Sequence, residues 1–244
     1  MANEDFTTYT EVDENNDITV TSSTVSWTSL SRGDNSYVYK DHGVDHFDGD
    51  FTHQFEMLIE NADVTVPRQV MWMIANAINN EEALISASED LQNIFYYDNT
   101  NLYLRVVEGG ASASTDIFAA FVEGTPYFVT VSRDDDGGAN NTGQLVAVIR
   151  TGSHTGTIQD TLTVDCSAGE QNDFRYLYAC ATYDTGHNNR DCDGYTQDMD
   201  LNEGAPPATT PQVIFISAMI PAMWVAQGKV TRRQFLRNTG LCFL

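Results

Sequence analysis

Apolar and polar residues alternate at every second position through much of this chain, and this pattern constrains the fold more than any other feature. In Phe51–Glu60, residues 51, 53, 55, 57 and 59 are apolar or histidine, and most of the residues between them are polar. Ile18–Val20, Val25–Trp27 and Tyr127–Val131 repeat the same period. Successive side chains of an extended strand point to opposite faces, so the alternation predicts half-buried β-strands.

Other segments extend this all-β interpretation. Val70–Ile78 is apolar at almost every position, as expected of a central strand, and Asp98–Asn101 is a polar turn between two apolar runs, which predicts a hairpin. Residues 1–203 contain no helical period longer than two turns, although Asn79–Leu91 is compatible with one short helix. Many short strands with polar turns predict a sandwich or a barrel. The remaining predicted strands are Ile94–Tyr97, Leu102–Val106, Leu145–Arg150, Phe174–Tyr183 and Tyr195–Leu201.

The composition divides the chain into a body, a linker and an arm. Residues 1–203 form the predicted β-domain, which is long enough to bury a core without a metal or disulfides. Residues 204–210 contain two adjacent prolines and are predicted to be a linker. Residues 211–244 combine the apolar run Val213–Ala226 with the basic segment Lys229–Arg237. Four irregularly spaced cysteines, which include Cys180 and Cys192, are too few for a disulfide framework and are expected to be buried thiols.

Charge is distributed unevenly between the body and the arm. Residues 1–203 contain all 35 acidic residues and eight basic ones, a net charge of −27, whereas residues 204–244 carry four basic residues and no acid. The acidic body would repel nucleic acid and anionic membranes, so neither is an expected partner. The apolar run has 14 residues, fewer than the ~20 that span a bilayer, and Pro221 interrupts it.

The arm is therefore expected to dock onto a neighbouring subunit, with packing on its own body or on a membrane surface as alternatives. The residues predicted to make this contact are Val213, Ile214, Phe215, Ile216, Met219, Ile220, Trp224, Arg232, Arg233 and Phe235.

The order of several strand patterns resembles that of a known superfamily. Pro126–Asp134 followed by Leu145–Arg150 resembles the paired central strands of concanavalin A-like, laminin-G-like jelly rolls, and Gly194–Leu201 resembles their closing strand. Phe174–Ala179 resembles the core strand between them, and Phe6–Lys40 resembles the first strands of jelly rolls predicted in phage and environmental virus genomes. The resemblance covers roughly residues 5–203 and implies a two-sheet antiparallel jelly-roll sandwich. That fold is shared by lectins, glucanases, adhesion modules and virion proteins.

Enzymatic activity is not expected from the residues. Glucanases of this superfamily carry acidic residues at positions i, i+2 and i+4 of one strand, and the nearest match is Glu56–Glu60. Leu58 stands at the middle position, where it can neither hydrogen-bond nor tune the flanking carboxyl groups. No other catalytic motif is recognised. Glu56 and Glu60 are accordingly interpreted as solvated side chains on the outer face of the strand.

Candidate binding residues are aromatic and acidic. Sugar rings stack on large rigid aromatic side chains, and Trp72, Tyr97 and Tyr183 are the predicted contacts, with Tyr103 among the further aromatic residues available. Asp45, Asp48 and Asp50 offer hard oxygen ligands on one loop and predict a calcium site, and no other cofactor is expected.

The sequence therefore predicts a non-enzymatic structural or decoration protein of a virus particle or other extracellular assembly. The acidic jelly roll would bind carbohydrate, and the arm would mediate self-assembly with other copies or with another particle protein. The alternative is a secreted-type lectin or glucan-active glycoside hydrolase of the same fold. The N-terminus has no basic and apolar segments typical of a signal peptide, and no transmembrane helix is expected.

Overall fold

β-strands dominate the chain. The computed structural model describes residues 3–44, 46–47, 49–63, 66–97, 100–139, 141–167, 174–184 and 190–202. Within this part, one 3-10 turn (η1, Phe6–Thr8) and one α-helix (α1, Glu81–Ser86) accompany the strands. The strands are β1 (Thr10–Val12), β2 (Ile18–Val20), β3 (Thr24–Ser31), β4 (Tyr37–Asp41), β5 (Phe51–Ala62), β6 (Arg68–Ala75), β7 (Leu91–Tyr97), β8 (Asn101–Glu108), β9 (Ala111–Phe118), β10 (Tyr127–Asp134), β11 (Gln144–Thr151), β12 (Thr157–Asp165), β13 (Tyr176–Thr182) and β14 (Asp191–Asn202).

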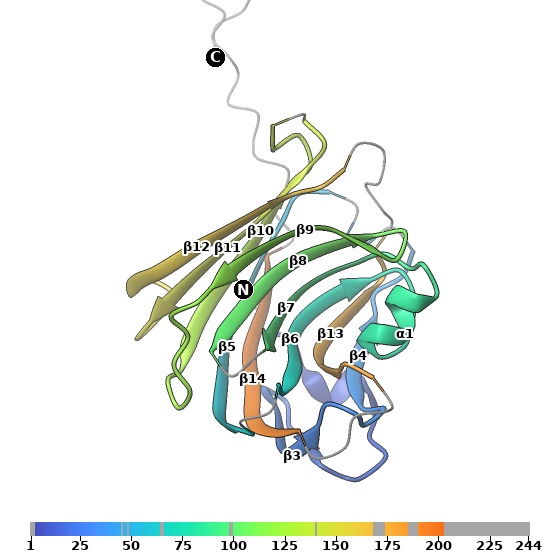
Figure 1. Ribbon diagram of the computed structural model, residues 1–244, viewed down its shortest axis with the longest axis vertical. Helices are drawn as coiled ribbons and strands as arrows, with labels where there is room; N and C mark the ends of the chain where they lie inside the picture. Colours follow the sequence, from blue (N-terminus) through green and yellow to red (C-terminus); the bar gives the residue numbers. More distant parts are fainter. Residues whose placement is uncertain are drawn as a thin grey trace, which may run out of the picture. The chain divides into compact units, whose positions relative to one another are not determined.

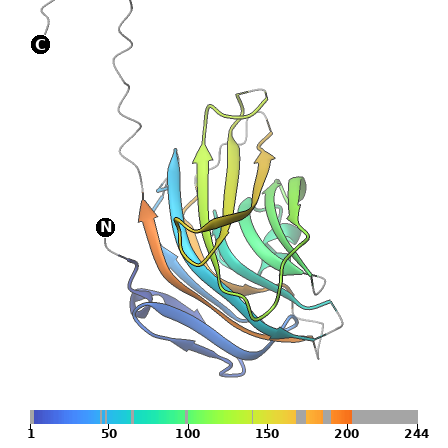
Figure 2. The same ribbon diagram turned by 90° about the vertical axis from the view of Figure 1, so that its left-hand side faces the viewer.

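The strands form two antiparallel sheets that face each other (Figures 1 and 2). Sheet A has the order β1-β4-β13-β6-β7-β8-β9, and sheet B has the order β12-β11-β10-β5-β14-β3-β2. Neighbours such as β13 and β4, or β14 and β5, are far apart in the sequence, which is the crossover pattern of a jelly roll. The structure confirms the two-sheet jelly-roll sandwich, and the predicted central pair, β10 and β11, is in register from Tyr127–Thr151 to Asp134–Gln144.

The main core lies between the sheets and follows the alternation in the sequence. In β5, residues 51, 53, 55, 57 and 59 are buried, and the residues between them are partly exposed. Sheet A contributes Trp72, Ile94 and Leu104 to the same apolar cluster. A second apolar cluster covers the outer face of sheet A, where Leu84 of α1 packs with Met73 and Leu91. Sheet A is therefore buried on both faces along part of its length.

The predicted secondary structure holds for most strands of the two sheets and misses four of them. The hairpin of β7 and β8 is confirmed, as is a short helix between residues 79 and 91, but β6 ends at Ala75 rather than at Ile78. Strands β1, β4, β9 and β12 were not predicted as separate strands. β9 and β12 are each the last strand of a sheet, and β12 is largely exposed, so its apolar alternation is weak.

The three cysteines in the described part of the chain, Cys166, Cys180 and Cys192, are buried free thiols, as expected. Residues 203–244, which include the predicted linker and arm, lie outside the described residues. No helix in the described part of the chain has the length and apolar character needed to cross a membrane.

Candidate functional site

The helix α1 lies on the outer face of sheet A and brings a carboxylate onto that face (Figure 1). Asn80 caps the helix by accepting a hydrogen bond from the Ala83 amide at 2.9 Å. The Glu82 amide donates to the Tyr183 carbonyl at 2.7 Å, which attaches the first turn to the end of β13. At the other end, Gly110 has φ +76° and approaches the Ile85 carbonyl so closely that a Cβ atom would lie 2.4 Å from it.

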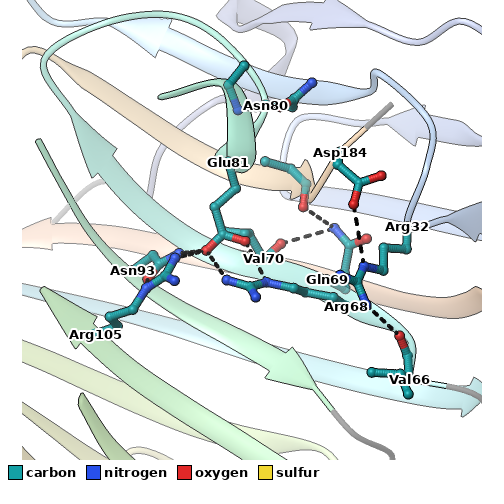
Figure 3. Close-up of polar contacts among 12 residues, drawn as sticks. Arg32, Val66, Arg68, Gln69, Val70, Asn80, Glu81, Asn93, Arg105 and Asp184 are labelled. Atoms are coloured by element: carbon teal, nitrogen blue, oxygen red, sulfur yellow. Dashed lines mark hydrogen bonds and ion pairs between the residues drawn. The ribbon is translucent and has the colours of Figure 1, made fainter. Parts of the chain in front are cut away.

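Glu81 is held between two arginines from strands β6 and β8 of sheet A, which flank β7 (Figure 3). Its side chain is fully buried. Arg68 of β6 donates to it from Nε at 2.7 Å and from Nη2 at 3.0 Å. Arg105 of β8 donates to the same carboxylate from Nη2, and the side-chain amide of Asn93 in β7 does so too. Three strands thus contribute donors to one carboxylate, which α1 carries.

The charges in this cluster keep Glu81 ionised. Burial by itself would raise the pKa of Glu81, but the positive charges of Arg105 and Arg68 outweigh burial and lower that pKa. Burial also lowers the pKa of Arg105, which the charge of Glu81 opposes. An arginine remains protonated under such conditions. Glu81 is consequently a fixed counter-charge and does not offer a proton at neutral pH.

Aromatic rings sandwich the guanidinium groups next to Glu81. The Arg68 guanidinium carbon lies 3.9 Å from the ring centroid of Tyr183 and 4.3 Å from that of Phe95. Arg32 contacts the same Tyr183 ring at 4.6 Å. Tyr97 lies 5.6 Å from Arg68 and 5.8 Å from Arg32. Stacked cation–π contacts of this kind fix the plane of a guanidinium group.

The strand register explains why these residues meet. Arg68 pairs directly with Tyr97, and in the next strand pair Asn93 faces Arg105. Phe95 faces Tyr103, and their rings stack at 5.0 Å with an interplanar angle of 9°. Residues directly opposite one another on antiparallel strands project from the same face of the sheet. We call this group the arginine–tyrosine site; its members are Arg32, Arg68, Glu81, Asn93, Phe95, Tyr97, Tyr103, Arg105 and Tyr183.

Part of the arginine–tyrosine site reaches the surface. Tyr97, Tyr103 and Tyr183 are partly exposed. The side chains of Arg68 and Arg105 are 11% and 10% exposed to solvent. Arg32 donates from Nη1 to the Val66 carbonyl at 3.3 Å, and its Nε lies 3.8 Å from Asp184. The site therefore has partly exposed tyrosine rings next to more deeply buried guanidinium groups, which hydrogen bonds and ion pairs hold in place.

Two of the three predicted sugar contacts belong to this site. Tyr97 and Tyr183 both contact Arg32 and Arg68 from the outer face of sheet A. Trp72 does not belong to it. Its side chain has 0% exposure between the sheets, where its Nε1 donates to Nδ1 of His53 at 3.2 Å. The bulge in β6 between Val70 and Trp72 places this residue on the inner face, so it cannot contact a sugar.

The arginines and Glu81 were not predicted from the sequence. They are separated by tens of residues, and none stands in a recognisable motif. The scarcity of cations was a usable signal, because in an acidic body with eight basic residues each basic side chain is a candidate for a specific role. The aromatic residues gave a stronger local signal than the arginines.

The other candidate residues lie elsewhere or beyond the described residues. Glu56, Leu58 and Glu60 share the outer face of β5, and Glu56 accepts a hydrogen bond from the Tyr195 hydroxyl at 2.6 Å. Of the predicted calcium ligands, Asp45 and Asp48 lie outside the described residues, and Asp50 accepts from the Asp135 amide at 2.9 Å. Within the described residues, no group of three or more His, Cys, Asp or Glu side chains is arranged to hold a metal ion.

Comparisons with known proteins give distant structural similarity. No protein-family model matches the chain, and no curated protein matches its sequence. It is similar to a protein of unknown function, SO2946, from Shewanella oneidensis MR-1 (TM-score 0.49, 10% identity, 79% of this chain and 76% of that chain). It is also similar to a functionally unknown protein from Saccharomyces cerevisiae (TM-score 0.48, 10% identity, 81% of this chain and 97% of that chain). A further similar structure is the PL-14 alginate lyase from Aplysia kurodai (TM-score 0.48, 9% identity, 80% of this chain and 87% of that chain). The fold assignment rests on the strand order and pairing described above.

Proposed function

We propose that this protein binds a saccharide at the arginine–tyrosine site and does not turn it over. The observation that carries the proposal is the partial exposure of Tyr97, Tyr103 and Tyr183 above a set of anchored guanidinium groups. Aromatic rings provide flat surfaces for the C–H faces of sugars, and guanidinium groups donate hydrogen bonds to sugar oxygens. Because the surrounding side chains are already fixed, binding would order few additional groups.

Binding without turnover fits the state of the carboxyl groups. Glycoside hydrolysis requires two carboxyl groups that flank the scissile bond, one of which must donate a proton. Glu81 is enclosed and ionised by its two arginines. Glu56 and Glu60 lie on the outer face of the other sheet, where Leu58 separates them. These positions favour a lectin-like role over a glucan-active hydrolase.

The replacement Tyr97→Ala tests saccharide binding. We expect a loss of about 10-fold or more in affinity, because removing the ring removes a stacking surface and releases one side of Arg68. Binding is measured by a glycan array followed by calorimetry on the best ligand. Tyr195→Ala is the matched control, since Tyr195 lies on the outer face of sheet B next to Glu56. Equal affinities of the two variants, or release of cleaved products by the intact protein, would contradict the proposal.

We also propose that residues 211–244 attach this domain to a neighbouring subunit in a virus particle or other extracellular assembly. The supporting observation is the contrast between an arm with four basic residues and no acid and a body of charge −27. Opposite charges would steer the arm toward the acidic surface of a neighbour, and burial of its apolar run would hold it there.

Removal of the arm is expected to convert an oligomer into a monomer. The full-length chain and the 1–203 fragment are sized by multi-angle light scattering at 50 mM and 500 mM salt, because screening weakens an electrostatically steered contact. The fragment retains all fourteen described strands, so its folding can be verified by its β-type circular dichroism spectrum. Assembly of the fragment to the same extent as the whole chain would exclude the arm as the anchor.

A further inference from the structure

We propose that the ligand of the arginine–tyrosine site is an anionic glycan, one that carries carboxylate or sulfate groups. This inference rests on the saccharide-binding function proposed above and specifies the chemical class of the ligand. It follows from the distribution of cations, from the hydrogen-bonding geometry of the guanidinium groups and from the local balance of charge.

Cations are concentrated at this site. Residues 1–203 contain eight basic residues, and three of them, Arg32, Arg68 and Arg105, surround the same few aromatic rings. Lys40 and Arg175 lie elsewhere and form ion pairs with Glu4 and Asp41, respectively. A chain with so many acids and so few cations has therefore placed more than a third of its positive charges in one group.

The local balance of charge opposes that of the rest of the body. The three guanidinium groups face two carboxylates, Glu81 and Asp184, which leaves the site with a charge of about +1. The body as a whole carries −27 and repels polyanions at long range. A local positive site on such a surface would select a short anionic group at close range, where direct hydrogen bonds outweigh the screened long-range field.

The guanidinium groups of Arg68 and Arg105 are held in fixed orientations and keep N–H donors for a second anion. Arg68 uses Nε and Nη2 to bind the Glu81 carboxylate in a bidentate manner, and Arg105 binds the same group through Nη2. Among the hydrogen bonds between described residues, Nη1 of Arg68 and Nη1 of Arg105 are not used, although both groups keep part of their surface exposed. Stacking on Tyr183 and Phe95 fixes both planes. Planar, charged forks match carboxylate and sulfate oxygens better than they match sugar hydroxyl groups.

Tyrosine rings next to these donors complete the recognition of a glycan rather than of a free anion. The Tyr97 ring centroid lies 5.8 Å from the Arg32 guanidinium carbon, 5.6 Å from that of Arg68 and 5.9 Å from the Tyr103 ring centroid. A sugar ring on the tyrosine surface would bring its acidic substituent to the guanidinium edges. The ligand class that fits both features is a short oligosaccharide that carries uronic acid or sulfate groups.

The test titrates the full-length protein with three oligosaccharide series: a polyuronate, the same chain after reduction of its carboxyl groups, and a sulfated glycan. We expect the charged ligands to bind at least 10-fold more tightly than the reduced chain at 150 mM salt, where the long-range repulsion by the acidic body is screened. A preference for one of the two charged series identifies the anionic group. Equal binding of the charged and the reduced chains would overturn the anionic inference but leave saccharide binding intact. No binding in any series would refute both.

Matched arginine variants locate the effect. Arg32→Gln removes a cation of the site without breaking the Glu81 pair, and Arg150→Gln removes one from sheet B, where Arg150 donates to Thr130 at 3.5 Å. We expect Arg32→Gln to weaken binding of the charged ligands about 10-fold and Arg150→Gln to leave it unchanged. Melting temperatures of both variants verify that they are folded. Equal losses in the two folded variants would show that charge in general, and not this site, governs binding, and would overturn the inference.

Discussion

Replacing Glu81 with glutamine is expected to lower the free energy of unfolding by about 3–5 kcal/mol. The Glu81 side chain has no exposure, and its carboxylate separates the guanidinium groups of Arg68 and Arg105. Glutamine keeps the shape but removes the negative charge, so two partly buried cations would face each other without compensation. The loss is measured by urea denaturation at pH 7, where the lowered pKa keeps the native carboxylate ionised.

Glu82→Gln provides the control for this effect. Glu82 is the next residue of the same helix, and its side chain is exposed. Its replacement should change the free energy of unfolding by no more than about 0.5 kcal/mol. If the two variants lose similar amounts, Glu81 does not hold the site together.

Acid is expected to destabilise the protein through a second buried group, His53. This residue has 0% exposure, accepts a hydrogen bond from Trp72 and stacks on Phe51 at 4.3 Å. Burial, together with the charges of His42 and His46, lowers the pKa of His53 to about 3. The folded state therefore keeps this ring neutral, whereas the unfolded chain takes up a proton near pH 6.5.

The direction of the pH effect follows from proton uptake. Between pH 6.5 and pH 3, the unfolded state binds more protons at this site than the folded state, so stability falls as the pH falls through that window. The loss approaches about 1.4 kcal/mol per pH unit, or on the order of 4 kcal/mol across the window. The variant His53→Gln cannot titrate and still accepts from Trp72. Urea unfolding from pH 7 to pH 4 should give a shallower decline for the variant than for the native protein, and parallel declines would exclude His53 as the cause.

The sequence and the structure agree where burial acts locally. Strand β5 alternates between buried and partly exposed residues along most of its length, as its alternation of apolar and polar residues predicts. The hairpin of β7 and β8 follows from its polar turn, and the short helix α1 lies within the segment Asn79–Leu91 that the sequence allowed to be helical. The edge strand β12 lacks this signal, because most of its side chains are exposed and fewer of them need to be apolar.

The arginine–tyrosine site illustrates what local patterns could not provide. The sequence singled out Tyr97 and Tyr183 as large aromatic residues available to a sugar, and the structure brings both against Arg68. Trp72 carried the same aromatic signal but faces the core, because a bulge in β6 decides which face it occupies. A bulge depends on strand pairing, and Val70–Ile78 is apolar at almost every position, so the sequence offers no alternation that shows which face Trp72 occupies.

By itself, the sequence determined that this chain forms an all-β body, because the period of two fixes which side chains are buried wherever a strand forms. It also determined the contrast of charge between the body and the arm. The tertiary structure alone decided that Arg32, Arg68, Glu81 and Arg105 meet on one face. Arg68 and Arg105 meet because of the strand order β6-β7-β8 and the register between those strands, which arise from contacts between residues distant in the sequence. Arg32 joins them from the end of β3, a strand of sheet B.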